Sequence, residues 1–254
     1  MKNSASGGAR WVDVAPERFP GWVASFARRH GADSEDQSLT MAVTGDRVTF
    51  TAPDGAVAEC HPPFPPVADN SKKRLAAETD GEAARPAEAS EVAEVAEAVA
   101  AHAQRPRTVG VLLVRLGGYA AGVFTGYPPA LADAKTGSRL VHGRSAAGGW
   151  SQHRFARRRE KQASEALQAA ASAAADVFGR RGGRDGQSGE TLDAVVLGGD
   201  KRAMAELRQD PRLAPYLAIA TDRFLTVPDP KRAVLEATPR LFLAVRIRLT
   251  EPTP

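Results

Sequence analysis

The sequence predicts an α+β fold in two parts, a small N-terminal α+β domain and a larger domain with a mixed β-sheet flanked by helices. Three observations favour this fold. Short strand-like runs near the N-terminus are separated by turn signals, including Pro53-Asp54-Gly55. A polar, charged stretch over 67–85 has few large apolar side chains, which is typical of a linker. Beyond it, apolar runs alternate with helical segments, and a protruding Gly-rich loop leads into a long basic helix.

The N-terminal domain is expected over residues 11–66, after a disordered tail over 1–10. A short helix is predicted over 16–30, because Trp22 and Phe26 lie four residues apart on one apolar stripe and Gly31 fits the helix end. Strands are predicted at 39–43, 48–51 and 56–60. The prolines within 61–66 then end regular structure.

The second domain is expected over residues 86–254, following the linker at 67–85. It begins with an amphipathic helix over 86–104, in which Val92, Val95 and Val99 share one face. The expected order after that helix is strands at 108–116, 119–125 and 138–142, a helix at 153–178, a connector at 179–190, a strand at 192–197, helices at 201–208 and 211–217, a short strand at 218–222, a helical segment at 231–237 and a closing strand at 241–249.

Charge is distributed unevenly along the chain. The 254 residues include 34 Lys and Arg and 30 Asp and Glu, for a formal net charge of +4. Acidic residues are concentrated in 78–97, whereas 139–162 contains no acid except Glu160. Local charge governs the binding of a polyanion more than the total does. The 139–162 segment is therefore the candidate surface for phosphate groups.

Cysteine content and hydropathy restrict the class of protein. Cys60 is the single cysteine, which excludes a disulfide within the chain and argues against a Cys-based zinc site. Residues 1–10 lack the apolar core of a signal peptide, and no run of about 18 apolar residues occurs. We expect a cytoplasmic, monomeric protein with no membrane contact, no metal and no organic cofactor.

The most informative segment is a Gly-rich loop that carries a glutamine. Gly148 and Gly149 allow positive φ angles and close approach of another backbone, so the loop can enter a narrow space. Gln152 is uncharged near neutral pH, but its amide can hydrogen-bond a water molecule or an ester oxygen. Backbone N–H groups at such a tip can stabilise a developing oxyanion. A protein that relies on these groups must borrow the rest of its active site, and for an ester at the end of a tRNA the borrowed groups would belong to ribosomal RNA and to the terminal hydroxyls of the tRNA.

Basic residues surround this loop. Most Gly-Gly pairs are ordinary turns, but cations on both sides favour a phosphate-binding role here. Spacings of three and four residues place several of them on one helix face. The predicted RNA-binding residues are Arg144, His153, Arg154, Arg157, Arg158, Arg159 and Lys161.

This region resembles the middle domain of eukaryotic and archaeal class-one release factors. The matching residues are Gly148-Gly149 and Arg154-Phe155-Ala156-Arg157, with further agreement at 174–178 and 192–199. The resemblance implies the same domain fold over most of 107–250. In those factors the glutamine follows the two glycines directly, whereas here Trp150 occupies that position and Gln152 comes two residues later.

A shifted glutamine is similar to the Vms-like release factor family, whose eukaryotic members free nascent chains in ribosome quality control. The chain is identified as an actinobacterial member. This resemblance implies a peptidyl-tRNA hydrolase for stalled ribosomes, with the large subunit, peptidyl-tRNA and rRNA as partners. It implies that Gln152 is catalytic, that Gly148 and Gly149 shape the loop, and that Trp150 and Ser151 form its tip. The alternative, kept open by Trp150, is an RNA- or ribosome-docking factor that does not cleave.

Other candidate motifs favour structural interpretations. Cys60-His61 has no cysteine partner, and Gly186-Gln187 lacks a basic helix after it. The turn Gly198-Gly199-Asp200 lies between a strand and a helix, so Asp200 is expected to cap that helix. Ser145 and Ser151 have no evident Asp–His pair that would make either a nucleophile.

Overall fold

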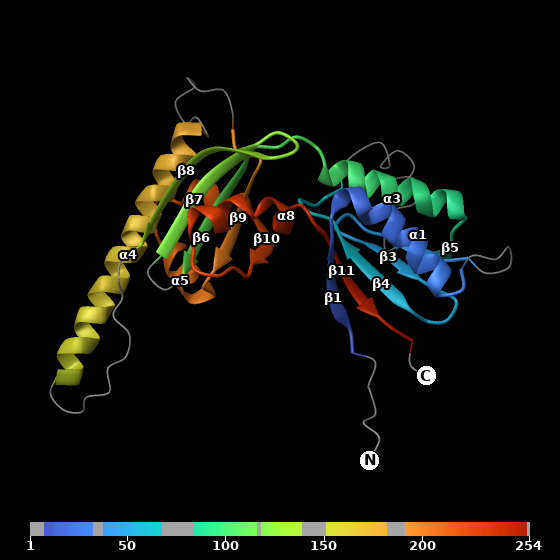
Figure 1. Ribbon diagram of the computed structural model, residues 1–254, viewed down its shortest axis with the longest axis horizontal. Helices are drawn as coiled ribbons and strands as arrows, with labels where there is room; N and C mark the ends of the chain where they lie inside the picture. The colour runs from blue at the N-terminus through green and yellow to red at the C-terminus, as the bar shows by residue number, and fades with distance from the viewer. Residues whose placement is uncertain are drawn as a thin grey trace, which may run out of the picture. The chain divides into compact units, whose positions relative to one another are not determined.

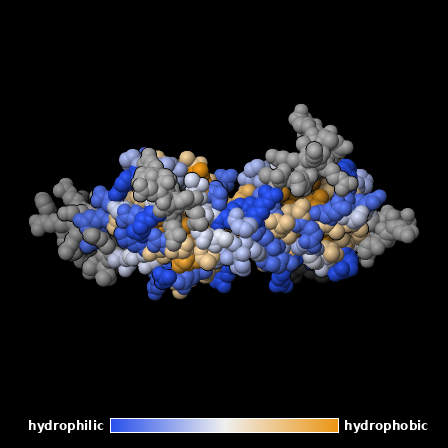
Figure 2. All heavy atoms as spheres, turned by 90° about the horizontal axis from the view of Figure 1, so that it is seen from above, coloured by the Kyte–Doolittle hydropathy of each residue, from blue (hydrophilic) through white to orange (hydrophobic). Residues whose placement is uncertain are grey.

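The computed structural model describes residues 8–32, 38–67, 84–115, 118–138, 151–181 and 191–252. Within the helix over 151–181, it describes the side chains of residues 162–180. The chain divides into two compact units (Figure 1). Unit 1 combines residues 1–105 with 243–254, and unit 2 comprises residues 106–242. In the view of Figure 2, hydrophilic residues predominate and apolar residues form small patches between them. None of the described helices is long and apolar enough to cross a membrane.

Unit 1 is an antiparallel sheet with helices on one face. Its strand order is β1-β11-β4-β3-β2-β5, and three helical segments pack on it. The strands are β1 (Arg10–Val14), β2 (Thr40–Val43), β3 (Val48–Thr51), β4 (Val57–His61), β5 (Arg85–Pro86) and β11 (Val245–Thr250). The helices are η1 (Pro16–Arg18), α1 (Phe19–Arg29) and α3 (Ala89–Ala103).

The core of unit 1 lies between this sheet and the helices. Phe19 and Phe26 of α1 and Phe50 of β3 are fully buried in it. The predicted hairpin is confirmed: the backbone N–H of Ala56 donates to Asp54 Oδ1 at 2.9 Å, and Gly55 takes the positive φ that this turn requires. The predicted helix after Pro16 is also confirmed.

The unit boundaries differ from the predicted domains 11–66 and 86–254. The helix and the closing strand that we expected in the second domain, α3 and β11, belong to unit 1. Strand β11 pairs with both β1 and β4, and α3 packs on α1. The physical reason is burial, because Ile247 and Val99 complete the apolar core between sheet and helices. Arg10, predicted to lie in the tail, begins β1.

Unit 2 is a mixed five-stranded sheet with the order β10-β9-β6-β7-β8. Strands β10, β9 and β6 are parallel, whereas β7 and β8 are antiparallel neighbours. The strands are β6 (Val109–Arg115), β7 (Gly118–Thr125), β8 (Ala130–Ser138), β9 (Ala194–Gly199) and β10 (Ala220–Leu225). The helices are α4 (Ser151–Arg181), α5 (Lys201–Leu207), α6 (Ala214–Leu217), α7 (Arg232–Glu236) and α8 (Pro239–Phe242).

Strand β8 was not predicted from the sequence, and it overlaps the strand expected at 138–142 only at Ser138. It spans Ala130–Ser138, and residues 139–142 lie outside the described part of the chain. The sequence of β8 shows no clean apolar alternation, because it is a half-exposed edge strand. It forms through pairing with β7 over its whole length.

The turn after β9 requires glycine at one position. Gly199 has a φ of +102°, and a Cβ atom there would lie 2.1 Å from the carbonyl oxygen of Val114. Asp200 follows and caps α5, because its Oδ1 accepts hydrogen bonds from the backbone N–H groups of Arg202 at 2.8 Å and Ala203 at 3.2 Å. The predicted capping role of Asp200 is therefore confirmed.

Candidate functional site

Helix α4 carries most of the predicted site residues. It begins at Ser151, two residues earlier than predicted, so Ser151 and Gln152 lie in its first turn rather than in the loop. No residue between 151 and 153 opposes helical geometry, and the glycines that do lie further upstream. Arg144, Gly148, Gly149 and Trp150 fall outside the described residues, as does the Gly186-Gln187 motif.

The basic residues follow Gln152 along the same helix. A continuous helix over Ser151–Arg181 means that Arg154, Arg157, Arg158 and Lys161 are three or four residues apart on a helical backbone. Residues at these spacings share a helix face. The first turn of a helix also has backbone N–H groups without intrahelical partners and a partial positive charge. This end of α4 therefore combines two features that attract anions.

The second half of α4 is anchored to the unit 2 sheet by alanine. Ala166, Ala170 and Ala174 repeat at four-residue intervals and are buried, with Ala170 and Ala174 fully so. Small side chains let the helix lie close to β7, where Ala121 is also fully buried. Figure 1 shows the first half of α4 extending past the sheet. The helix is thus fixed at one end and projects at the other.

Ion pairs reinforce this anchored half. Lys135 Nζ of β8 donates to Asp176 Oδ2 at 3.0 Å, and Arg180 Nε donates to Asp133 Oδ2 at 2.9 Å. The hydrogen bond and the charge of Lys135 hold the pKa of Asp176 below its usual value. Arg212 Nη1 also donates to Ser172 Oγ of α4, at 2.8 Å. Asp176 of α4 is therefore paired where the helix meets the sheet.

The alternative chemical motifs have structural roles. Cys60 is fully buried in β4, and burial raises the pKa of its thiol far above the normal range. A thiol in that state is a poor nucleophile and a poor metal ligand. His61 lies with its ring 5.5 Å from the ring of Trp11. Within the described residues, no group of three or more His, Cys, Asp or Glu side chains is placed to hold a metal ion.

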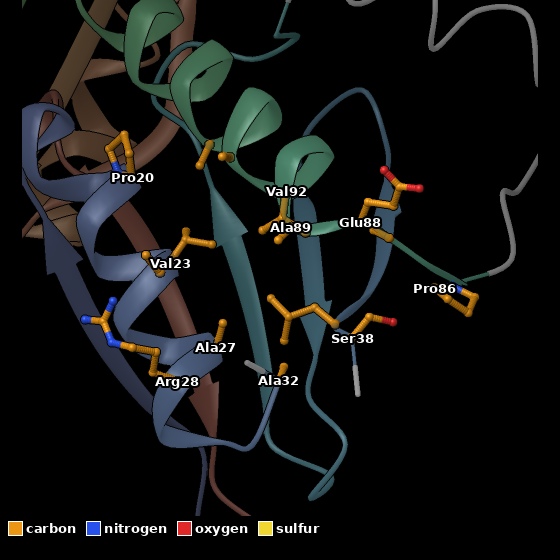
Figure 3. A pocket seen from close by; sticks show the side chains of 15 residues that line it. Pro20, Val23, Ala27, Arg28, Ala32, Ser38, Pro86, Glu88, Ala89 and Val92 are labelled. Carbon is orange, nitrogen blue, oxygen red and sulfur yellow. The ribbon is translucent and has the colours of Figure 1, made fainter. Parts of the chain in front are cut away.

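A groove in unit 1 is apolar and contains none of the predicted site residues. It lies between α1 and α3, with a volume of about 750 Å³ (Figure 3). Val23, Ala27 and Val92 are typical of its lining, and Arg28 and Glu88 are its charged members. Such a surface offers burial but no cluster of reactive groups. The chemistry-bearing residues are therefore on unit 2.

Comparison with known proteins identifies the family. The Actinobacteria/chloroflexi VLRF1 release factor family matches residues 107–248, which is more than half of the chain and includes all of α4. The chain belongs to this family. Membership in VLRF1 confirms the resemblance drawn from Gly148-Gly149 and the Arg154–Arg157 stretch, and it associates the protein with translation and the ribosome. The comparison with curated proteins gives no match.

Solved structures of translation factors share a distant likeness with this VLRF1 protein. The archaeal translation termination factor aRF1 is 13% identical, with 94% of this chain and 68% of that chain covered and a TM-score of 0.39. Dom34 of S. cerevisiae, a translation termination-like factor involved in RNA quality control, is 10% identical, with 93% and 64% covered and a TM-score of 0.29. The chain thus spans about two thirds of the length of each protein.

Proposed function

We propose that this VLRF1 protein is a peptidyl-tRNA hydrolase that releases nascent chains on stalled ribosomes or on large subunits in the cytoplasm. The observation that carries the proposal is the family match over 107–248, because this range contains the Gly148-Gly149 pair, Gln152 and the basic start of α4. Peptidyl-tRNA, rRNA and the large subunit are the proposed partners, and the protein acts as a monomer.

The reaction is hydrolysis of the ester that joins the peptide to the terminal ribose of tRNA. The oxygen of water bonds to the ester carbonyl carbon, the bond from that carbon to the ribose oxygen breaks, and a proton passes to the ribose oxygen. The amide of Gln152 positions the attacking water through hydrogen bonds. Backbone N–H groups beside it stabilise negative charge on the carbonyl oxygen. Groups of the tRNA and the rRNA complete the site.

The basic residues around Gln152 hold it against the RNA by binding phosphate groups. Arg144 precedes the Gly148-Gly149 pair, and Arg154, Arg157 and Lys161 follow it on α4. Their guanidinium and ammonium groups bind backbone phosphates, which fixes the position of a protein on RNA without reading its sequence. The second half of α4 packs on the sheet, so the basic first half is held in a defined direction.

Peptide release from purified ribosome–nascent-chain complexes and large-subunit–peptidyl-tRNA complexes tests the proposal. The wild type is expected to release the peptide, and Gln152→Ala is expected to abolish release without weakening binding. Gln162→Ala on the same helix and Gln187→Ala in the second Gly-Gln motif are matched controls that should retain release. If the wild type binds both complexes but releases nothing, the docking-factor alternative, which Trp150 favours, replaces the hydrolase.

A further inference from the structure

A second positively charged feature of unit 2 lies apart from the basic half of α4. It is a pocket of about 390 Å³, which we call the strand-end pocket. Its lining consists of Arg115 at the end of β6, Gly118 at the start of β7, residues 136–138 at the end of β8, and residues 229–232 before and at the start of α7. None of these residues belongs to a motif for which the sequence predicts a function.

Cations outnumber carboxylates three to one in the strand-end pocket, where Arg115, Lys231 and Arg232 face the single acid Asp229. Arg115 is held in place, because its Nη1 donates to the carbonyl oxygen of Val227 at 2.8 Å. Its Nε lies 3.9 Å from Asp229 Oδ1, at the limit of an ion pair. The pocket therefore has excess positive charge at a fixed position.

Lys231 is the cation with unused binding capacity. Its side chain is exposed, and within the described part of the chain it forms neither an ion pair nor a hydrogen bond. Arg232 differs, because its Nε pairs with Glu236 at 2.8 Å. An ammonium group has three donors and suits a phosphate as a compact charge.

The remaining lining suits a small anion with several oxygen atoms. Thr136 and Ser138 contribute exposed hydroxyl groups that can donate hydrogen bonds. Gly118 leaves space between the strand and the ring of Pro230, because a Cβ atom there would lie 3.6 Å from Pro230 Cδ. Donors of two kinds thus surround a hollow large enough for a phosphate group.

The pocket lies on the opposite face of β8 from α4. Asp133 and Lys135 of β8 pair with α4, and side chains alternate along a strand. Thr136 and Ser138 therefore point to the other face, where residues 229–232 complete the pocket. Ser138 is also the last residue of β8, so the chain leaves this pocket directly into the segment that contains Gly148-Gly149.

We propose that the strand-end pocket binds a backbone phosphate of RNA and so gives the protein a second point of attachment, separate from the basic helix face. This inference rests on the proposed function, since it takes peptidyl-tRNA or rRNA as the source of that phosphate. The basic half of α4 and the strand-end pocket are separate parts of unit 2, so phosphate contacts at both fix its rotation on the RNA, which one helix contact alone leaves free. Rotation about α4 determines where Gln152 lies relative to the ester.

The test is equilibrium binding to large-subunit–peptidyl-tRNA complexes, with every protein carrying Gln152→Ala so that hydrolysis does not interfere. Lys231→Gln should weaken binding about tenfold, as expected for one charge-assisted hydrogen bond. It should also reduce the slope of log K against log salt by about 0.7 to 0.9, the value for one phosphate contact. Lys231→Arg, which keeps the charge, should bind nearly as well as the parent.

Two further variants make the test specific for the pocket. Asp229→Asn removes the single acid of the lining and should tighten binding. This effect is opposite to that of Lys231→Gln, and a folding defect would not produce it. Lys201→Gln removes an exposed lysine that is not part of the pocket lining and should change binding less than twofold. Binding by the Lys231→Gln and Asp229→Asn proteins within twofold of the parent overturns the proposal, and so does an equal loss in Lys201→Gln.

Separate measurements with free tRNA and with large subunits lacking tRNA identify which RNA supplies the phosphate, because the Lys231→Gln defect should persist with that RNA only. Failure of this inference is distinguishable from failure of the hydrolase proposal. Retained release by the Gln152→Ala protein contradicts the hydrolase mechanism and leaves the binding result valid. Unchanged binding by the Lys231→Gln protein contradicts the pocket and leaves Gln152-dependent release intact.

Discussion

Lys135 of β8 and Asp176 of α4 form an ion pair with 3.0 Å between Nζ and Oδ2, which joins the edge strand of unit 2 to its longest helix. A second pair, Asp133 with Arg180, lies one turn further along α4. Both pairs are at least partly exposed to solvent, so each adds little stability by itself. The two pairs instead orient α4, because they fix the direction in which its basic half projects.

Asp176 of this contact and Asp210, which pairs with Arg212, predict an acid-dependent loss of stability. Hydrogen bonds from Lys135 to Asp176 and from Arg212 to Asp210 hold both carboxyl pKa values below the ordinary 3.8. A carboxyl with a depressed pKa stabilises the fold above its unfolded pKa, and this contribution disappears as the pH falls through the folded pKa. Below about pH 4 the melting temperature should therefore fall less steeply in Asp176→Asn/Asp210→Asn than in the wild type.

Thermal melts at a series of pH values check this expectation. Asp222→Asn, which alters an exposed aspartate of β10, is the control and should follow the wild-type curve. Parallel curves for all three proteins would show that the two aspartates are not linked to folding.

The alanine repeat of α4 predicts strong sensitivity to added volume. Ala170→Leu places a larger side chain where the helix meets the sheet, and overpacking should destabilise the protein by about 1–3 kcal/mol. Ala163→Leu makes the same change at an exposed position of the same helix, where little effect is expected. Urea unfolding of both variants measures the difference. Equal stabilities would mean that α4 does not pack tightly on the sheet.

Two glycines should respond to alanine with opposite signs. Gly199→Ala should destabilise the protein by at least about 2 kcal/mol, because the residue has positive φ and its Cβ would clash with Val114. Gly21 lies in α1 with nothing within 4 Å of an added Cβ, so Gly21→Ala should stabilise by about 0.5–1 kcal/mol. Chemical denaturation of both variants measures the change in the free energy of unfolding. No change in Gly199→Ala would contradict the described turn.

The basic face of α4 predicts salt-dependent binding to ribosomal complexes. The triple variant Arg154→Gln/Arg157→Gln/Arg158→Gln should reduce the slope of log K against log salt by about 2, since each lost phosphate contact changes it by about 0.7 to 0.9. Arg202→Gln, which alters a side chain that is 92% exposed on α5, serves as the single-charge control. Binding measured between low and high salt gives the slopes. An unchanged slope in the triple variant would exclude these arginines from RNA contact.

Local patterns in the sequence were sufficient for most elements and for the motif residues on α4. The turn at Asp54-Gly55, the capping by Asp200 and the apolar alternation in β11 each depend on residues close together in the chain. The helical spacing of Arg154, Arg157 and Arg158 is likewise a local property. Such features can be predicted because neighbours along the chain determine them.

Features made by distant segments were not predictable in this way. Strand β8 exists because β7 offers it a pairing edge, and β11 joins unit 1 because β1 and β4 leave a gap for it. The strand-end pocket combines Arg115 with Lys231, and these residues are more than a hundred positions apart. No local motif marks either residue, so only the folded arrangement shows that they share one surface.

The position of β11 between β1 and β4 makes unit 2 an insertion within unit 1. During synthesis, the first 105 residues leave the exit tunnel without the strand that must fill the gap in their sheet. Unit 1 can close only after all of unit 2 has been translated, so the edges of β1 and β4 stay exposed during that interval. We therefore expect proteases and chaperones to distinguish the growing chain from the finished protein by this one missing strand.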